Sequence, residues 1–229
     1  EERRRLGIPE NAVVLGTFIR LHPQKRPLDL LALARRFGDD LGGDDLGGDD
    51  LGGDDGAGPW LVLMGGGPLD ETVDRELERD PPPRFVRLPM RVDPLPVYDA
   101  LDLCLMTSDY EGLPVFLLDG MARGLPGIAP RVGDVPLLFE DGGGVAAGAP
   151  GDLDALEAAI RRLLDPEARM RASERARHTI EKRFGLDRYA AAYERLIFEP
   201  DAASWEDPAS EDPASGDPAP GDPASGETA

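Results

Sequence analysis

One stretch, residues 101–123, most constrains how this 229-residue chain can fold. It begins with an apolar run over residues 101–106, which is about the length of a buried strand. A polar segment over residues 108–112 follows, and Pro114 then suits the first turn of a helix, where its missing N–H costs no hydrogen bond. The stretch therefore predicts a strand, a tight turn and a helix over residues 115–123, in that order.

The start of this helix has the chemistry of a ligand site. In an open α/β sheet, the free N–H groups of Leu113, Val115 and Phe116 would lie at the carboxyl end of a strand, where anions bind. Glu111 and Asp119 flank them with carboxylates, which can accept hydrogen bonds from sugar hydroxyls. The pattern suits a sugar joined to a nucleotide diphosphate. The plainer alternative is that Glu111 only caps the helix and Asp119 lies on a solvated face.

The same residues resemble a known family. Glu-Gly-Leu-Pro at 111–114, an acid eight positions after the Glu, and Gly-Met-Ala-Arg-Gly-Leu-Pro at 120–126 are similar to the Glu-x7-Glu region of retaining GT-B glycosyltransferases. The nearest group is family 4, with its "glycosyl transferases group 1" domain. The resemblance implies that Glu111 contacts the donor sugar and Asp119 the ribose, although Asp119 is one methylene shorter than the usual Glu. Donor contacts are further expected from Gly112, Leu113, Val115 and Phe116.

A basic loop follows an earlier apolar run. The run over residues 12–19 predicts a strand, and residues 20–27 (Arg-Leu-His-Pro-Gln-Lys-Arg-Pro) resemble the family's Gly-Arg-Leu-x-Pro-x-Lys-Gly loop. By position, Arg20 and Lys25 match the cations that hold the donor diphosphate, whereas Arg26 stands where the family usually has Gly. Two fixed cations would stabilise the charge that grows as the glycosidic bond breaks. Taken alone, the loop is better explained by surface cations in solvent.

A glycine turn follows the predicted strand over residues 60–64. Residues 65–68 are Gly-Gly-Gly-Pro, and Asp70 breaks the Gly-x-Gly-x-x-Gly pattern of dinucleotide-binding proteins. No P-loop is present in the sequence either, which counts against a nicotinamide dehydrogenase or a P-loop nucleotidase. The turn resembles the family's Val-Gly-x-Gly-Pro, and its glycines either make the bend or let a ligand approach. A strand over residues 84–88 is then followed by Met90, a candidate contact for the nucleotide base.

The remaining pattern alternates helices and strands. Helices are predicted over residues 28–37, 69–79, 95–100, 152–164, 166–184 and 186–198, and strands over residues 127–130 and 145–147. This alternation indicates an α/β fold with a Rossmann-like, doubly wound parallel sheet. The resemblance implies that the sheet corresponds to the carboxyl-terminal half of a GT-B enzyme.

The net charge of −20 is concentrated in two segments. Residues 39–55 hold eight Asp, and residues 199–229 hold nine acids, with no Lys or Arg in either, so the rest of the chain carries 28 acids and 25 bases. Nucleic-acid binding is disfavoured because this remainder has no basic excess. The single cysteine, Cys104, is expected in the core of a cytoplasmic protein. No secretory signal or membrane-length apolar segment is visible, which leaves peripheral membrane contact open.

The two acidic segments define the expected domains. Residues 1–199 are predicted to form a nucleotide-sugar-binding domain, with a disordered acidic insert at 38–58 and a disordered Pro/Ala/Asp repeat tail at 200–229. The Leu-Gly-Gly-Asp-Asp repeat in the insert fits neither an EF-hand nor a calcium-binding β-helix. The first residues resemble the end of a helix, so an upstream portion is expected.

The resemblance implies an enzyme that transfers a sugar, with retention, from a nucleotide diphosphate donor. Arg20, Lys25 and Glu111 are the expected catalytic residues, and no metal or cofactor is expected because the two His form no cluster with ligand spacing. A separate or missing acceptor domain would complete the enzyme, so the chain alone should transfer poorly. The alternative is a truncated or degenerate relative that only binds a nucleotide or nucleotide sugar, toward which Asp119 and Arg26 lean. A scaffold domain would explain the sheet but not the ordered motifs.

Overall fold

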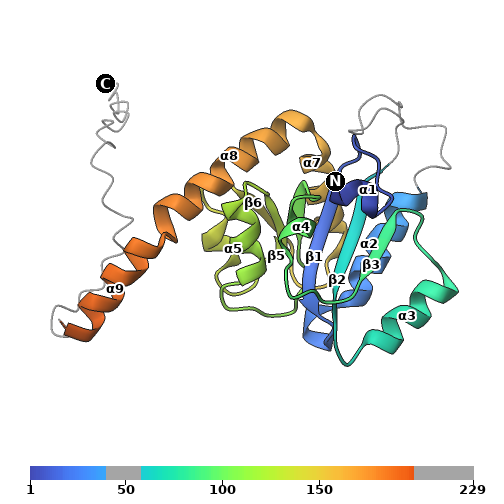
Figure 1. Ribbon diagram of the computed structural model, residues 1–229, viewed down its shortest axis with the longest axis horizontal. Coiled ribbons are helices and arrows are strands. Elements are labelled where there is room, and N and C mark those ends of the chain that lie inside the picture. Colours follow the sequence, from blue (N-terminus) through green and yellow to red (C-terminus); the bar gives the residue numbers. More distant parts are fainter. Residues whose placement is uncertain (40–57, 199–229) are drawn as a thin grey trace, which may run out of the picture. The chain divides into compact units, whose positions relative to one another are not determined.

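A single parallel sheet organises the chain (Figure 1). The computed structural model describes residues 1–39 and 58–198, and within these ranges the sheet has six strands. The strands are β1 (Val14–Arg20), β2 (Trp60–Gly66), β3 (Phe85–Leu88), β4 (Leu103–Leu105), β5 (Gly127–Pro130) and β6 (Gly144–Ala147). All adjacent pairs are parallel, which confirms the predicted doubly wound α/β fold.

The strand order is β3-β2-β1-β4-β5-β6. The chain runs outward from β1 to β3 and then returns to place β4 beside β1, where Leu15 pairs with Leu103 and Gly16 with Cys104. The direction of winding therefore reverses between β1 and β4. In open α/β sheets, ligands bind outside the carboxyl ends of the strands at such a reversal.

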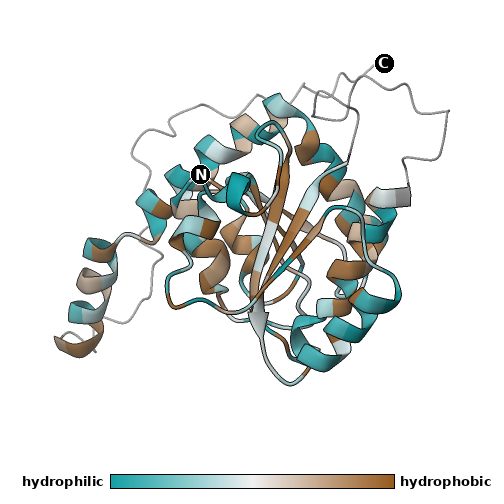
Figure 2. Cartoon of the chain, turned by 45° about the vertical axis from the view of Figure 1, so that its right-hand side comes forward, coloured by the Kyte–Doolittle hydropathy of each residue, from teal (hydrophilic) through white to brown (hydrophobic). Residues whose placement is uncertain are grey.

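Helices cover both faces of the sheet. They are α1 (Glu2–Arg5), the 3₁₀ helix η1 (Pro23–Lys25), α2 (Pro27–Asp39), α3 (Asp70–Arg79), α4 (Leu95–Tyr98), α5 (Val115–Ala122), α6 (Val135–Leu138), α7 (Leu153–Leu164), α8 (Pro166–Arg183) and α9 (Leu186–Phe198). Helices α2, α3 and α7 share one core cluster with β1 and β2, whereas α5 packs on β4 and β5 (Figure 1). In Figure 2 the strands are largely hydrophobic and α3 is largely hydrophilic, as expected for a sheet buried on both faces.

Strand β4, which precedes the predicted turn over residues 108–112, is shorter than predicted. The run over residues 101–106 forms β4 only from Leu103 to Leu105. Asp102 instead turns its carboxylate to the amino end of the sheet, where Oδ2 accepts hydrogen bonds from the Val14 N–H at 2.7 Å and the Arg3 guanidinium at 2.8 Å. Pro114 is likewise the N-cap of α5, one position before the helix proper. Boundaries of this kind depend on long-range polar contacts that periodicity does not contain.

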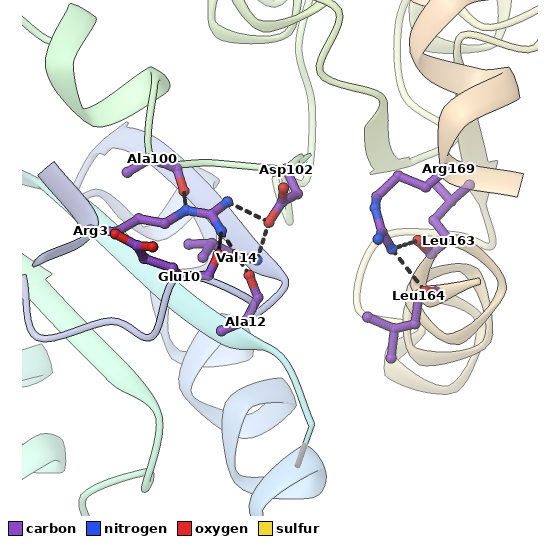
Figure 3. A network of polar contacts seen from close by, with 9 residues as sticks. All are labelled: Arg3, Glu10, Ala12, Val14, Ala100, Asp102, Leu163, Leu164 and Arg169. Carbon is purple, nitrogen blue, oxygen red and sulfur yellow. Dashed lines mark hydrogen bonds and ion pairs between the residues drawn. The ribbon is translucent and has the colours of Figure 1, made fainter. Parts of the chain in front are cut away.

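A polar network fixes α1 at the rim of the sheet where the amino ends of β1 and β4 lie (Figure 3). Arg3 donates hydrogen bonds to the carbonyl oxygens of Ala100, Glu10 and Ala12 at 2.8–3.0 Å, besides its pair with Asp102. One guanidinium therefore ties α1 to the segments that enter β1 and β4. The same view shows Arg169 donating to the carbonyls of Leu163 and Leu164 at the end of α7, so this side chain has a capping role.

The chain divides into two compact units, residues 1–181 and residues 182–229. The first contains the whole sheet. Of the second, residues 182–198 are described, and α9 buries none of its side chains there. The predicted disordered insert, apart from its flanking residues, and the predicted tail lie outside the described residues.

Candidate functional site

Two loops meet at the carboxyl ends of β1 and β4. We call residues 20–26 the basic loop and residues 106–114 the β4–α5 loop. The Asp109 N–H donates to the Gln24 carbonyl at 2.8 Å, and the Gln24 side-chain amide donates to the Tyr110 carbonyl at 2.8 Å. The buried Thr107 hydroxyl donates to the Lys25 carbonyl at 2.9 Å. These contacts fix the two loops side by side at the point where the winding of the sheet reverses.

The loops bring Lys25 and Glu111 into an ion pair. Lys25 Nζ hydrogen-bonds Glu111 Oε1 across a separation of 86 residues. Both side chains are largely covered, at 23% and 12% exposure, so their attraction is screened less than that of a surface pair. Two residues from separate sequence motifs are therefore in direct contact, while the ligand that they would bind stays a prediction.

A second ion-paired cation lies next to Lys25. Arg26 is the one described residue other than glycine with a positive φ, at φ 48° and ψ 53°, a conformation that costs most residues about 1–2 kcal/mol. Its guanidinium contacts Asp29 at 2.6 and 3.4 Å and Asp109 at 3.1 Å. Both carboxylates raise the pKa of Arg26, with Asp29 contributing most. The backbone geometry also accounts for the glycine that the family usually has at this position.

Arg20, the last residue of β1, is exposed beside the glycine turn. A Cβ on Gly67 would lie 3.2 Å from Arg20 Cγ and 2.7 Å from the Leu21 carbonyl oxygen, and one on Gly65 would lie 2.0 Å from the carbonyl oxygen of Ile19. These two glycines are needed so that the turn can pack against the end of β1. Close packing within the chain therefore explains them without a ligand.

Asp70 and Arg87 fix the same turn. The Gly67 N–H donates to Asp70 Oδ2 at 2.7 Å, and Arg87 donates to Asp70 Oδ1 at 2.6 Å and to the Gly65 carbonyl at 2.9 Å. Because Asp70 already occupies the Gly67 N–H, this donor is not free to bind a phosphate in the described conformation. A Cβ on Gly66 would meet only the Asp70 carboxylate, at 3.6 Å or more, so Gly66 is the open position of the turn.

The start of α5 is open. Pro114 caps the helix with no side-chain hydrogen bond, and the N–H groups of the first helical residues have no partner within a helix. Leu113 and Val115 are 37% and 65% exposed, and a Cβ on Gly112 would meet nothing within 4 Å. Backbone donors and an exposed surface therefore stand next to Glu111, while Phe116 is partly covered.

The loop after β5 supports the β4–α5 loop from its other side. The Asp134 N–H donates to the Gly112 carbonyl at 3.2 Å. Gly133, at φ 47°, approaches so closely that a Cβ there would lie 2.0 Å from the Glu111 carbonyl oxygen. The backbone that carries Glu111 is thus held by the basic loop and by the loop after β5.

Asp119 and Met90 are the two predicted ligand contacts that make no polar contact with the Lys25–Glu111 pair among the described residues. Asp119 is exposed on α5 and lies close enough to Tyr98 and Cys104 to contribute to their raised pKa values, of which burial is the main cause. Met90 is 53% exposed after β3, where its neighbour Arg91 pairs with Glu2 at 2.7 Å. Within residues 1–39 and 58–198, no hydrogen bond or ion pair joins either side chain to the two loops, so their predicted roles stay predictions.

Parts of the chain are similar in sequence to known proteins. The model of the "Glycosyl transferases group 1" family matches residues 57–166. The D-inositol 3-phosphate glycosyltransferase of Saccharomonospora viridis is 30% identical over 194 residues, which cover 79% of this chain and 41% of that protein. Residues 57–166 therefore carry the glycosyl transferases group 1 domain. The N-acetyl-alpha-D-glucosaminyl L-malate synthase of Bacillus anthracis is 31% identical over 99 residues, which cover 43% of this chain and 26% of that synthase.

Solved structures of other proteins share the fold of this chain. Sucrose-phosphate synthase from Thermosynechococcus elongatus aligns with a TM-score of 0.69 at 21% identity, covering 88% of this chain and 49% of that one. Anabaena Alr3699/HepE in complex with UDP aligns with a TM-score of 0.67 at 21% identity, covering 88% and 51%. The chain spans less than half the length of the curated relatives it matches.

Sequence reasoning missed the residues that hold the two loops together. Thr107, Asp109 and Gln24 make the connecting hydrogen bonds. The available signal was the polar segment directly after an apolar run, since side chains there lie at the ligand rim of a parallel sheet. Their partners could not be read from it, because each contact spans more than 80 residues.

The described residues contain neither a metal-binding cluster nor a membrane-spanning helix. In the part that the structure describes, no three His, Cys, Asp or Glu side chains gather closely enough to hold a metal ion. Among the helices of residues 1–39 and 58–198, none combines the length and apolar character needed to cross a membrane.

Proposed function

We propose that this chain is the donor-binding part of a retaining glycosyltransferase that takes a sugar from a nucleotide diphosphate. Arg20 and Lys25 bind the diphosphate together with the backbone N–H groups at the start of α5. Glu111 accepts hydrogen bonds from the sugar hydroxyls, and Asp119 accepts them from the ribose. No metal ion or cofactor takes part.

The observation that carries this proposal is the meeting of Lys25 with Glu111 at the reversal point of the sheet. A diphosphate needs cations and backbone donors, and a sugar needs hydroxyl acceptors. The basic loop supplies the first, the β4–α5 loop supplies the second, and the open start of α5 adds backbone donors beside both. Similar folds bind such ligands, since Anabaena HepE is known in complex with UDP-glucose.

The proposed chemistry relies on fixed charges. As the bond between the sugar and the diphosphate lengthens, negative charge grows on the leaving diphosphate. Arg20, Lys25 and the α5 N–H groups are positioned before the reaction begins, so they stabilise this charge without reorganising. Retention of configuration follows from the family's chemistry and is part of the proposal.

The chain alone is expected to bind donor and to transfer poorly. Transfer requires an acceptor held against the donor and a site closed to water. Since the chain covers 41% of the inositol-phosphate glycosyltransferase that it resembles, we propose that a further acceptor-binding portion completes the enzyme.

Titration calorimetry with UDP-, GDP- and ADP-sugars tests the donor site. At least one should bind, and Arg20→Ala or Lys25→Ala should weaken it about fivefold or more, as expected for about 1 kcal/mol or more from a lost charge-assisted hydrogen bond. Arg4→Ala is the matched control, because Arg4 is 79% exposed on α1 at the opposite rim. Silence for all three donors, with the chain folded, would refute the proposal.

A second candidate function is a non-catalytic module that binds a nucleotide or nucleotide sugar. Asp119, which is one methylene shorter than the family's usual Glu, and Arg26, which stands where the family usually has Gly, favour it. The coding sequence directly upstream discriminates the two. An in-frame α/β half there supports the transferase, whereas a start codon without an adjacent partner gene supports the module.

A further inference from the structure

Arg26 adopts a conformation that needs an explanation from its surroundings. Its left-handed backbone is unfavourable for any residue with a Cβ, and glycine would adopt it freely. Such strain persists only where neighbouring contacts determine the conformation, which is common at functional sites. The contacts of the Arg26 side chain therefore show what the residue does here.

The guanidinium bridges two elements of the site. Nε and one terminal nitrogen contact Asp29 in the first turn of α2, and the other terminal nitrogen contacts Asp109 in the β4–α5 loop. Each of the three nitrogens thus has a carboxylate partner. The side chain is 34% exposed and Asp29 is 16% exposed, so the bridge lies partly within the protein.

The Arg26 bridge adds ion pairs to a connection between the two loops that otherwise depends on few contacts. Apart from it, the two loops are joined by the Lys25–Glu111 ion pair and by the hydrogen bonds of Thr107, Asp109 and Gln24. Arg26 directly follows Lys25 in the chain, and Asp109 lies two residues before Glu111. Any movement of one loop against the other would therefore separate Lys25 from Glu111.

We propose that Arg26 is a positioning residue of the donor site, which holds the basic loop and the β4–α5 loop at the separation where Lys25 meets Glu111. The inference rests on the function proposed above. Arg26 acts through Asp29 and Asp109 and does not itself bind the diphosphate. A glycine here would remove the backbone strain but would also remove the side-chain bridge from Asp29 to Asp109.

The competing role is a direct contact between Arg26 and the diphosphate, and Asp109 distinguishes the two. If Arg26 positions the loops, Asp109→Asn breaks the bridge and weakens nucleotide binding. If Arg26 binds the diphosphate, Asp109→Asn removes a negative charge and frees the guanidinium, so binding stays equal or tightens.

The test uses the full chain with Arg26→Gly, Asp109→Asn and the double variant, with UDP or whichever donor nucleotide the wild type binds as the probe in titration calorimetry. We expect each single variant to weaken binding about threefold to tenfold, and the double variant to be no weaker than either, because both changes remove one bridge. Unchanged affinity in Arg26→Gly, or unchanged or tighter affinity in Asp109→Asn, overturns the proposal.

A second measurement needs no ligand. The Asp109 N–H bonds to Gln24 across the two loops, so Arg26→Gly should speed its hydrogen exchange at least several-fold in the free chain. Unchanged exchange overturns the positioning role. If the wild type binds no nucleotide, the proposed donor site fails, while this exchange rate still decides whether Arg26 holds the loops.

Arg36→Ala is the matched control. Arg36 lies on α2 and, like Arg26, bridges two carboxylates, those of Asp154 and Glu157, at 2.6 and 3.0 Å. Its removal should lower the melting temperature slightly and leave both nucleotide affinity and Asp109 exchange unchanged. An equal loss of affinity in Arg36→Ala would show that general destabilisation explains the result, which overturns the proposal.

Discussion

The Lys25–Glu111 ion pair has a consequence for binding at the residue scale. A nucleotide diphosphate must compete with Glu111 for Lys25, and a carboxylate near a diphosphate also repels it. Glu111→Gln should therefore tighten the binding of UDP about threefold to tenfold, since UDP lacks the transferred sugar that would use the carboxylate. The same variant should lose much of its preference for a UDP-sugar over UDP.

Calorimetry with the two ligands on one protein preparation measures both effects. The wild type and Glu111→Gln are compared, and the ratio of the two dissociation constants isolates the contribution of the sugar. If Glu111→Gln binds UDP more weakly than the wild type, the carboxylate supports the site in a way that this reasoning does not include.

Cys104 gives a pH dependence at the same scale. Burial raises the pKa of its thiol well above the usual value, with a smaller contribution from Asp119, so the folded chain keeps a proton that the unfolded chain loses above about pH 8.5. This contribution to stability is fully present below that pH and is lost as pH rises. We expect the unfolding free energy of the wild type to fall by up to about 1.4 kcal/mol per pH unit more steeply than that of Cys104→Ala above pH 9.

Urea unfolding of both proteins at pH 7, 9 and 10 measures the difference. Tyr98, whose pKa is raised mainly by burial, is present in both proteins, and Cys104→Ala removes only the smaller contribution that Cys104 makes to that pKa. Parallel pH profiles would mean that the thiol is more accessible than its 0% exposure indicates.

At the scale of elements, α5 lies as close to β4 as it does because residue 120 has no side chain. A Cβ on Gly120 would lie 2.2 Å from the Cys104 sulfur. Alanine would gain about 1 kcal/mol in helix propensity, but the forced separation of helix and strand should cost about 1–3 kcal/mol. Gly120→Ala is therefore expected to be net destabilising.

The double variant Gly120→Ala/Cys104→Ala identifies the cause. Removing the sulfur leaves room for the new methyl group, so the double variant should be more stable than the sum of the two single effects predicts. Thermal and urea unfolding measure all four proteins. A Gly120→Ala chain at least as stable as the wild type would show that α5 can move without cost.

The same element shows what the sequence could predict. The strand, turn and helix over residues 101–123 follow from local apolar patterning and from Pro114, and the structure contains them in that order. The expectation that Lys25 and Glu111 serve one site came from the resemblance to the family's motifs, not from local hydrophobic pattern. The bridge through Arg26 and the shortening of β4 by Asp102 could not be foreseen, because each depends on ion pairs between residues more than 80 positions apart.

At the scale of the whole molecule, net charge opposes the proposed ligand. The chain carries −20 overall, and deleting residues 41–55 and 201–229, which lie outside the described residues, would reduce the formal charge to −6. Both segments have compositions that bury little apolar surface, so their removal should leave the melting temperature of the domain nearly unchanged. The deletion therefore changes the long-range electrostatic field while keeping the sheet and its loops.

A diphosphate approaching a strongly negative protein is repelled over distances that salt controls. At 10 mM salt, where the Debye length is about 30 Å, the double deletion should bind UDP about threefold or more tightly than the full chain, mainly through faster association. At 1 M salt, where the length falls to about 3 Å, the two proteins should bind alike. Calorimetry and stopped-flow measurements at both salt concentrations provide the test. An affinity difference that persists unchanged at 1 M salt would mean that one of the two acidic segments contacts the site directly.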